Sequence, residues 1–230
     1  MLDRLTWLSL EVHRLDRARS FYEETLGLDF EVAEGVATAD VGGTDLRLVE
    51  PGPVPRGGLH VHYAFATPPE RYDDWVTRLS ESFDLEEHRF GSARSLYLDD
   101  PDAHCVEIGD VGPEGADEPL TGIFEVVLEV EHLARAESFY RRLGFEVVDR
   151  GTERRRIRLT GPMALELWEP QLGLADARGG VHVDLGFAAE DPIAVADAVE
   201  DLAASVEETD DGVVIRDRDG HAVTVVATAA

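Results

Sequence analysis

The sequence predicts an α+β protein in which one strand-helix-strands unit occurs four times, arranged as two tandem domains. Two internal repeats predict this fold class. Residues 56–65 (Arg-Gly-Gly-Leu-His-Val-His-Tyr-Ala-Phe) return as residues 178–187 (Arg-Gly-Gly-Val-His-Val-Asp-Leu-Gly-Phe). A Ser-Phe-Tyr segment followed by Leu-Gly also occurs twice, beginning at Ser20 and at Ser138, which are 118 positions apart. Similarity at a fixed spacing is typical of repeated structural units.

The first two units are expected in residues 1–111. Residues 5–12 alternate as a strand, and residues 17–26 have apolar residues at helical spacing before Gly27, which favours a helix end. Short strands follow at 36–41 and 46–50. The second unit begins with a strand from Leu59, and Pro68-Pro69 starts its helix. Its strands are expected at 85–90, 95–98 and 105–109, with an Asp-Pro-Asp turn at 100–102.

Residues 112–122, rich in Gly, Pro and acidic residues, are the expected linker to a second domain at 123–230. The third unit has a strand at 123–130 and a helix at 134–143. Its residues 163–170 repeat residues 44–51 at an offset of 119. The fourth unit is expected to run from Val181 through a helix begun by Pro192 to a hairpin of residues 213–216 and 222–227.

The composition is strongly acidic. Asp and Glu number 48 against 21 basic residues, the net charge is −27, and every basic residue is Arg because the chain has no Lys. Such a surface repels nucleic acid and anionic membranes, so we expect neither as a partner. A halophilic cytoplasm is the expected setting, because concentrated salt screens the self-repulsion of an acidic protein.

A cytoplasmic location is also favoured by three simpler features. The single cysteine, Cys105, permits no internal disulfide and is typical of a reducing interior. No apolar run is long enough to span a bilayer, and the first residues do not lead into the apolar core of a signal peptide.

The repeated motifs resemble the vicinal oxygen chelate superfamily. They are the Ser-Phe-Tyr and Leu-Gly helices of the first and third units, and the Asp-Pro-Asp turn before the strand that holds Glu107. The superfamily includes glyoxalase I, extradiol dioxygenases, fosfomycin- and bleomycin-resistance proteins and methylmalonyl-CoA epimerase. The resemblance covers nearly the whole chain and implies two cup-shaped half-barrels of mixed β-sheet with helices outside. It is specific for fold rather than reaction, because this fold serves many reactions.

The resemblance also implies where a divalent metal would bind. Members hold it with up to four residues, one on the first and one on the last strand of each of two paired units. Motif spacing places these positions, in unit order, at Trp7 and Arg47, His62 and Glu107, Glu125 and Glu166, and Asp184 and Thr224. An error of one residue in strand register would turn a side chain to the other face. An even-step error would bring in Glu129 or Glu169 instead.

Two pairings of the units are open. Pairing within each domain gives two cups with damaged ligand sets. Pairing across domains, as in glyoxalase I, gathers the metal-type residues in one cup, and we favour it for that reason: His62, Glu107, Glu125 and Glu166. One imidazole and three carboxylates suit Mn, Ni, Fe, Co or Zn. Glyoxalase I has Gln or His where this chain has Glu125, so the chain departs from the family pattern by an extra negative charge.

The favoured function is a metal-dependent lyase or isomerase of glyoxalase type, acting on a small substrate with vicinal oxygens. The metal would stabilise an enediolate, and Glu107 or Glu125 would move the proton. One alternative is a binding protein without chemistry, with Trp7, Trp75 and Trp168, together with Tyr63 and Phe65, as apolar lining. The other is an extradiol dioxygenase, for which His60, His62 and Glu107 are the nearest set. The protein is expected as a tandem-domain monomer or a homodimer.

Each candidate also has a structural interpretation. A strand histidine such as His62 is often a packed core residue, and we interpret His60 in that way. A carboxylate buried in an apolar strand, as expected for Glu107, needs a partner or a metal. Glu125 and Glu166 can equally be outward residues of half-exposed strands. We interpret residues 154–156, three consecutive arginines, as a solvated strand end, with an anionic substrate as the alternative. His104 and His221 are expected to be solvated.

Overall fold

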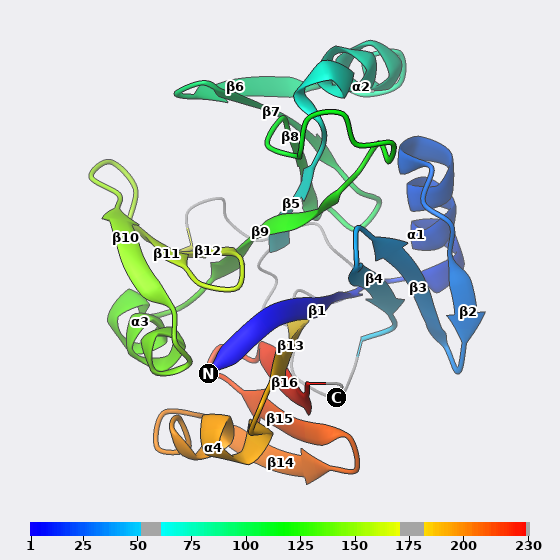
Figure 1. Ribbon diagram of the computed structural model, residues 1–230. Helices are drawn as coiled ribbons and strands as arrows, with labels where there is room; N and C mark the ends of the chain where they lie inside the picture. The colour runs from blue at the N-terminus through cyan, green and yellow to red at the C-terminus, as the bar shows by residue number, and fades with distance from the viewer. Residues whose placement is uncertain (52–60, 171–181, 229–230) are drawn as a thin grey trace.

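The computed structural model describes residues 1–51, 61–170 and 182–228, so His60 and most of both Gly-Gly turns lie outside the described residues. The described chain forms two eight-stranded sheets of mixed direction with four α-helices around them (Figure 1). This is the α+β architecture of four repeated units that the sequence predicts. No helix in the described part of the chain is long and apolar enough to cross a membrane.

The first half of the chain contains two units of the predicted kind. The first consists of β1 (Leu2–Glu11), α1 (Leu15–Phe21), β2 (Glu31–Ala33), β3 (Val36–Val41) and β4 (Thr44–Val49). A π-helical turn, Tyr22–Leu26, extends α1 and ends at Gly27, whose φ of 73° is the predicted left-handed helix end. The second consists of β5 (Val61–Ala66), α2 (Tyr72–Leu79), β6 (Glu86–Phe90), β7 (Ala93–Asp99) and β8 (Cys105–Gly109). A 3-10 turn, Pro69–Arg71, precedes α2.

The second half repeats the pattern. Its first unit consists of β9 (Gly122–Glu129), α3 (Leu133–Arg142), β10 (Glu146–Arg150), β11 (Arg156–Thr160) and β12 (Ala164–Trp168). Its second unit consists of β13 (Val183–Ala189), α4 (Pro192–Asp197), β14 (Ser205–Thr209), β15 (Gly212–Arg216) and β16 (Ala222–Ala227). Asp191 caps α4 by accepting the backbone N–H of Ala194, and Pro192 occupies the first helical turn, as expected for a helix start.

The two sheets do not follow the two halves of the sequence. The first sheet has the order β14-β15-β16-β13-β1-β4-β3-β2, and the second has the order β10-β11-β12-β9-β5-β8-β7-β6. The first unit therefore pairs with the fourth, through antiparallel β1 and β13, and the second pairs with the third, through antiparallel β5 and β9. The exchanged pairing that we favoured from the sequence is confirmed.

The register of the parallel strand pairs is equivalent in all four units. The residue directly opposite the last-strand position is Ser9 for Arg47, Ala64 for Glu107, Val127 for Glu166 and Gly186 for Thr224. In every unit this opposite residue lies two positions after the first-strand candidate. The eight positions taken from motif spacing therefore occupy equivalent places, and those of each sheet share one face because strand side chains alternate.

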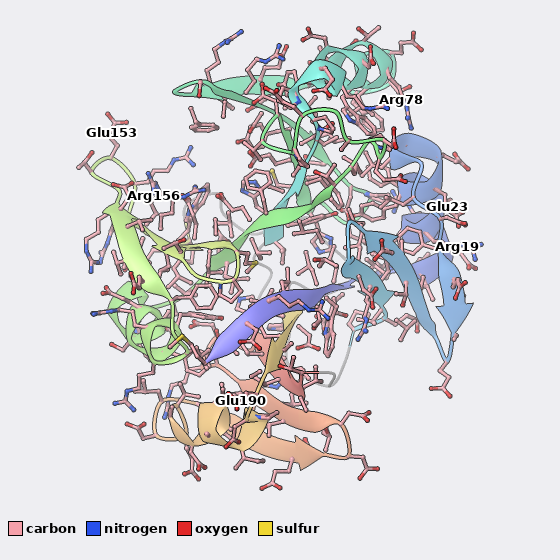
Figure 2. The ribbon with its side chains drawn as sticks, viewed as in Figure 1. Arg19, Glu23, Arg78, Glu153, Arg156 and Glu190 are labelled. Atoms are coloured by element: carbon pink, nitrogen blue, oxygen red, sulfur yellow. The ribbon has the colours of Figure 1, made fainter. Side chains whose placement is uncertain are left out.

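The other face of each sheet packs into one core shared by all four units. Tyr63, Phe65, Val126 and Leu128, which alternate with His62 and Glu125, are fully buried there. The helices lie at the periphery of the molecule (Figure 1). Charged side chains such as those of Arg19 and Glu23 lie on its outside (Figure 2).

The Ser-Phe-Tyr helix and the Asp-rich turn are joined by a buried hydrogen bond between the two sheets. The Tyr22 hydroxyl donates to Asp100 Oδ2 at 2.7 Å and contacts the Tyr63 hydroxyl, and His104 Nδ1 lies 3.0 Å from the same Asp100 oxygen. In the second half, the Tyr140 hydroxyl donates to Asp217 at 3.1 Å. These repeated motifs tie neighbouring units of one chain half together.

The two turn histidines are a correction to the sequence prediction. His104 is fully buried and His221 is 4% exposed, whereas solvated side chains were expected. The aspartate at the start of each turn accepts the backbone N–H of its histidine at 2.9 Å, so the turn folds inward over the tyrosine. A turn composition rich in Asp predicts exposure, but this hydrogen-bond network satisfies the polar groups inside the protein.

Candidate active site

The second sheet carries a cavity of about 770 Å³ between its two halves. The wall from the second unit is formed mainly by β5, β6, β7 and β8, and the wall from the third unit by β9, β11, β12 and the residues before β11. All four predicted metal-type residues line this one cavity: His62, Glu107, Glu125 and Glu166. Each is between 4% and 7% exposed.

His62 and Glu107 form the pair on the second unit. His62 Nε2 lies 2.8 Å from Glu107 Oε2, and Ser95 and Tyr97 also hydrogen-bond to this carboxylate. Burial alone would raise the pKa of Glu107, but the hydrogen bonds and the charge of His62 outweigh burial and lower it. Glu107 is therefore an ionised, firmly held carboxylate.

Glu125 and Glu166 form the pair on the third unit, joined by Arg158. The Arg158 guanidinium contacts Glu125 Oε2, and its Nη1 lies 2.9 Å from Glu166 Oε1. Glu166 also accepts hydrogen bonds from Trp168 Nε1 at 2.7 Å and Arg156 Nη1 at 3.3 Å. Both carboxylates point into the cavity, so the interpretation of them as outward residues of half-exposed strands does not hold.

The pKa of Glu125 is raised to about 7. Burial is the main cause, Arg158 opposes it, and the negative charges of Glu166 and Glu107 add to the increase. A carboxyl with this pKa exchanges its proton near neutral pH, which is the property required of a general base or acid.

The arginines of residues 154–156 divide between the cavity and the surface. Arg154 and Arg156 line the cavity, whereas Arg155 pairs with Glu169 at 2.8 Å. The guanidinium of Arg154 lies 5.0 Å from the centre of the Trp168 ring, and Arg156, labelled in Figure 2, also pairs with Asp149. Arg154 is exposed, as our interpretation of this run as a solvated strand end expects, although it also borders the cavity. For Arg156, which is only partly exposed and pairs with Glu166, that interpretation is wrong. Arg158, which no sequence motif singled out, is the third basic residue in the cavity.

Aromatic rings complete the cavity. The Tyr97 ring lies edge-on to the rings of His62 and His88, and the Trp168 ring lies edge-on to His62. Trp168 thus lines the site, as the binding-protein alternative expects. Trp75 does not, because it belongs to the core, where its Nε1 donates to Thr67 Oγ1 at 3.0 Å.

The four equivalent positions in the first sheet bond to one another. Trp7 Nε1 donates to Asp184 Oδ2 at 2.9 Å, and Thr224 Oγ1 donates to Asp184 Oδ1 at 2.7 Å. The Arg47 guanidinium lies 4.0 Å from the centre of the Trp7 ring. These four side chains contact one another and include a single carboxylate, that of Asp184. Both of its oxygens already accept a hydrogen bond.

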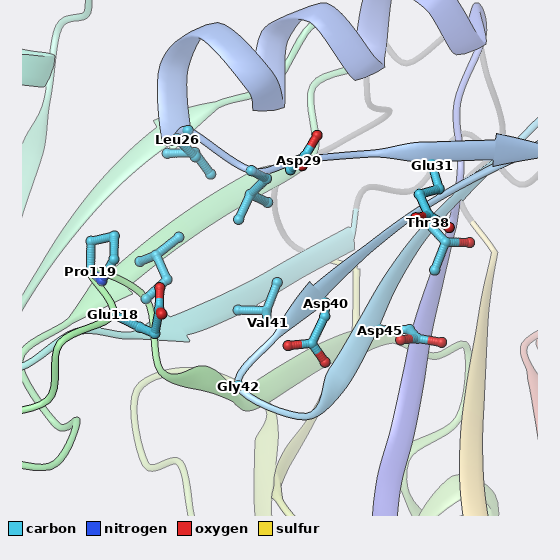
Figure 3. A pocket seen from close by; sticks show the side chains of 13 residues that line it. Leu26, Asp29, Glu31, Thr38, Asp40, Val41, Gly42, Asp45, Glu118 and Pro119 are labelled. Atoms are coloured by element: carbon cyan, nitrogen blue, oxygen red, sulfur yellow. The ribbon is translucent and has the colours of Figure 1, made fainter.

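A separate cavity of about 580 Å³ lies beside β2, β3 and β4 of the first sheet (Figure 3). Its lining is acidic and includes Asp29, Glu31, Asp40, Asp45 and Glu118. None of the first sheet's four metal-equivalent side chains lines it. The titratable residues that we selected from the sequence lie instead in the larger cavity of the second sheet.

The second cup fits a divalent metal by its donor types. One imidazole and three buried carboxylates line the same cavity, and such a set suits borderline and hard divalent ions. Within the described residues, however, no three of the His, Cys, Asp and Glu side chains converge as a ready metal cluster. Each of the three carboxylates has a partner in the metal-free protein, namely His62 for Glu107 and Arg158 for the other two.

Comparisons with known proteins agree with this fold. Residues 4–108 match the sequence model of the family described as "Glyoxalase/Bleomycin resistance protein/Dioxygenase superfamily". No curated protein matches the sequence.

Two solved structures resemble the whole chain. A putative dioxygenase from Bacillus subtilis is 16% identical with a TM-score of 0.72, and the match covers 100% of this chain and 86% of that one. Glyoxalase I from Zea mays is 20% identical with a TM-score of 0.67, covering 97% of this chain and 92% of that one. At these identities the likeness establishes the fold alone.

Proposed function

We propose, from the premise that residues 4–108 belong to the Glyoxalase/Bleomycin resistance protein/Dioxygenase superfamily, that the protein is a divalent-metal-dependent lyase or isomerase. Its substrate is a small molecule with two adjacent oxygens. The supporting observation is that four buried, ligand-type side chains from two different chain halves line one cavity of the second sheet. His62, Glu107, Glu125 and Glu166 would hold the metal.

When bound, the metal would supply a Lewis acid that polarises the substrate's two oxygens. The proton transfer falls to the protein. Of the two candidates we assign the base to Glu125, because in the metal-free cavity burial raises its pKa to about 7, within the range where a carboxylate exchanges protons near neutral pH. Glu107 has a lowered pKa, and one of its oxygens is bonded to His62. It would therefore serve as a metal ligand and not as the group that exchanges the proton.

The cavity walls orient the substrate. Tyr97 and Trp168 provide flat apolar surfaces on opposite halves of the cup, and Arg154 and Arg156 provide positive charge on one wall. No acidic side chain among the described residues pairs with Arg154, so its guanidinium is available to an anionic group of the substrate.

A second candidate, a binding protein without chemistry, is favoured by one observation. The acidic and basic groups of the cavity already neutralise one another, through Glu107 with His62 and through Glu125 and Glu166 with Arg158. The extradiol dioxygenase alternative needs a second histidine in the cup. The histidine that we selected for it, His60, lies outside the described residues, and His88, which also lines the cavity, is exposed and pairs with Glu86.

Metal content separates these candidates. We would purify the wild type, Glu166→Gln and Asp184→Asn in high salt, supply Mn, Ni, Co or Zn, and measure bound metal by elemental analysis. The proposal expects about one metal per chain. The metal should be lost in Glu166→Gln, which alters the cup that would hold it, and kept in Asp184→Asn, which alters the other cup. Absence of metal from all three proteins would refute the metal-dependent function and favour the binding protein.

A further inference from the structure

We propose that Arg158 is a built-in cation that competes with the divalent metal for Glu125 and Glu166. The inference rests on the proposed function, because it concerns the same four-residue site. It assigns to Arg158 control over when that site accepts a metal.

The contacts of Arg158 span both carboxylates of the third unit. Its guanidinium contacts Glu125 Oε2 and lies 2.9 Å from Glu166 Oε1. The two carboxylate side chains are each 7% exposed, whereas the Arg158 side chain is 36% exposed and lines the cavity. The carboxylates are therefore held in place, and the arginine is the partner with open space beside it.

The symmetry of the cup shows what is unusual about this position. In β7, Tyr97 lies opposite Glu107, and in β11, Arg158 lies opposite Glu166. The equivalent place is thus a neutral phenol in one half and a cation in the other. The cation occurs in the half that carries two carboxylates, Glu125 and Glu166, where the other half carries one carboxylate and one imidazole.

Charge balance explains the pairing. Two buried carboxylates repel each other, and leaving both without a cation is costly in a site of low dielectric constant. Arg158 stabilises them in the metal-free protein. A divalent ion bound to the same oxygens supplies that stabilisation itself and is repelled by the guanidinium, so the two cations exclude each other.

The test is metal affinity measured without turnover. We would titrate metal-free wild type, Arg158→Gln and Arg156→Gln with Mn²⁺ and follow free Mn²⁺ by electron paramagnetic resonance. Arg156 is the matched control, because it is also an arginine that pairs with Glu166 Oε1, whereas Arg158 pairs with Glu125 as well. We expect the dissociation constant to fall about tenfold or more in Arg158→Gln and about threefold or less in Arg156→Gln.

The opposite result has a clear meaning. If Arg158 instead positions the two glutamates for the metal, Arg158→Gln binds Mn²⁺ more weakly than the wild type, and the competition is refuted. Equal affinity in wild type and Arg158→Gln, or equal gains in the two variants, also overturns it while leaving the metal-dependent function intact. No binding by any of the three proteins removes the metal-dependent function itself.

A conservative variant guards against loss of folding. Arg158→Lys keeps the positive charge but cannot bridge two carboxylates with a planar fork. We expect it to bind Mn²⁺ more tightly than the wild type and less tightly than Arg158→Gln, with circular dichroism confirming a folded protein. Equal Mn²⁺ affinities for Arg158→Lys and the wild type would contradict the bridging role of Arg158.

Discussion

The two cups have the same strand order and register but opposite contents. In the second sheet, the four equivalent positions hold one imidazole and three carboxylates around a cavity of about 770 Å³. In the first sheet, they hold Trp7, Arg47, Asp184 and Thr224, which bond to one another. Identical backbone positions therefore support either an open polar site or a filled structural one, and the side chains decide which.

The residue that Trp7 packs against, Gly186, also differs between the two cups. Gly186 lies opposite Thr224 in the first cup, and Ala64 lies opposite Glu107 in the second. A Cβ atom at Gly186 would fall 2.0 Å from ring carbon Cδ2 of Trp7. The indole thus occupies the volume of a missing side chain, so the filled cup depends on a glycine that the open cup does not need.

The largest effect is expected from closing that volume. Gly186→Ala should lower the free energy of unfolding by about 3 kcal/mol or more, because the indole and the new methyl group cannot share the space. Equilibrium unfolding in guanidinium chloride at high salt measures the change. The matched variant Ala64→Gly, in the open cup, should cost about 1 kcal/mol or less. Equal costs in the two cups would contradict the packing difference.

A smaller effect is expected from the pKa of Glu125 in metal-free protein. Its pKa of about 7 when folded is above the ordinary value of 4.5, so the folded state holds this proton more tightly. The corresponding stability is present at low pH and is lost as the pH rises through the window from about 4.5 to about 7. The loss should be about 3 kcal/mol, because the pKa is shifted by about 2.5 units and each unit corresponds to about 1.4 kcal/mol.

Glu125→Gln isolates this contribution from the other titrating groups. The free energy of unfolding is measured from pH 4 to pH 8 for both proteins, and the wild type minus variant difference should fall across that window. The same pH series on Asp184→Asn, in the first cup, serves as the control for removing a carboxylate at an equivalent position. A difference that stays constant with pH would show that Glu125 titrates normally.

The smallest effect on stability is expected from removing the hydroxyl of either buried tyrosine that links the sheets. Tyr22 contacts both Tyr63 and Asp100, whereas Tyr140 donates to Asp217 at 3.1 Å. We expect Tyr22→Phe to cost about 1–2 kcal/mol and Tyr140→Phe about 1 kcal/mol, since the first removes a hydrogen bond from each of two buried groups, Tyr63 and Asp100. Thermal unfolding of both variants ranks them. The reverse order would show that the second network is the tighter one.

The fold was predictable because its signals are local and repeated. Alternation, helical spacing and Gly27 fixed the elements of the first unit, and the offset of 118 residues transferred them to the third. The exchanged pairing followed from one further idea, that compatible ligands gather in one cup. The positions of His62 and Glu166 in one cavity agree with that idea. Their role as metal ligands remains a proposal.

The partners of the site residues were not predictable in the same way. Arg158 alternates with apolar residues in β11, as many exposed strand residues do, and only the packing of two units brings Glu125 within its reach. Likewise, the Asp-rich turn around His104 looks solvated until the helix of another unit covers it. Contacts between distant segments decide these cases, and the local pattern does not contain them.

The exchanged pairing sets an order of events during synthesis. The second sheet joins neighbours in the chain, so its last strand, β12, is complete once residue 168 has been made. In the first sheet, β1 is synthesised first but pairs with β13, which is synthesised near the end of the chain together with β16. Because chain closure over such separations is slow, the cup that carries the candidate site is expected to form first on the ribosome. The first sheet then forms last, when β13 pairs with β1.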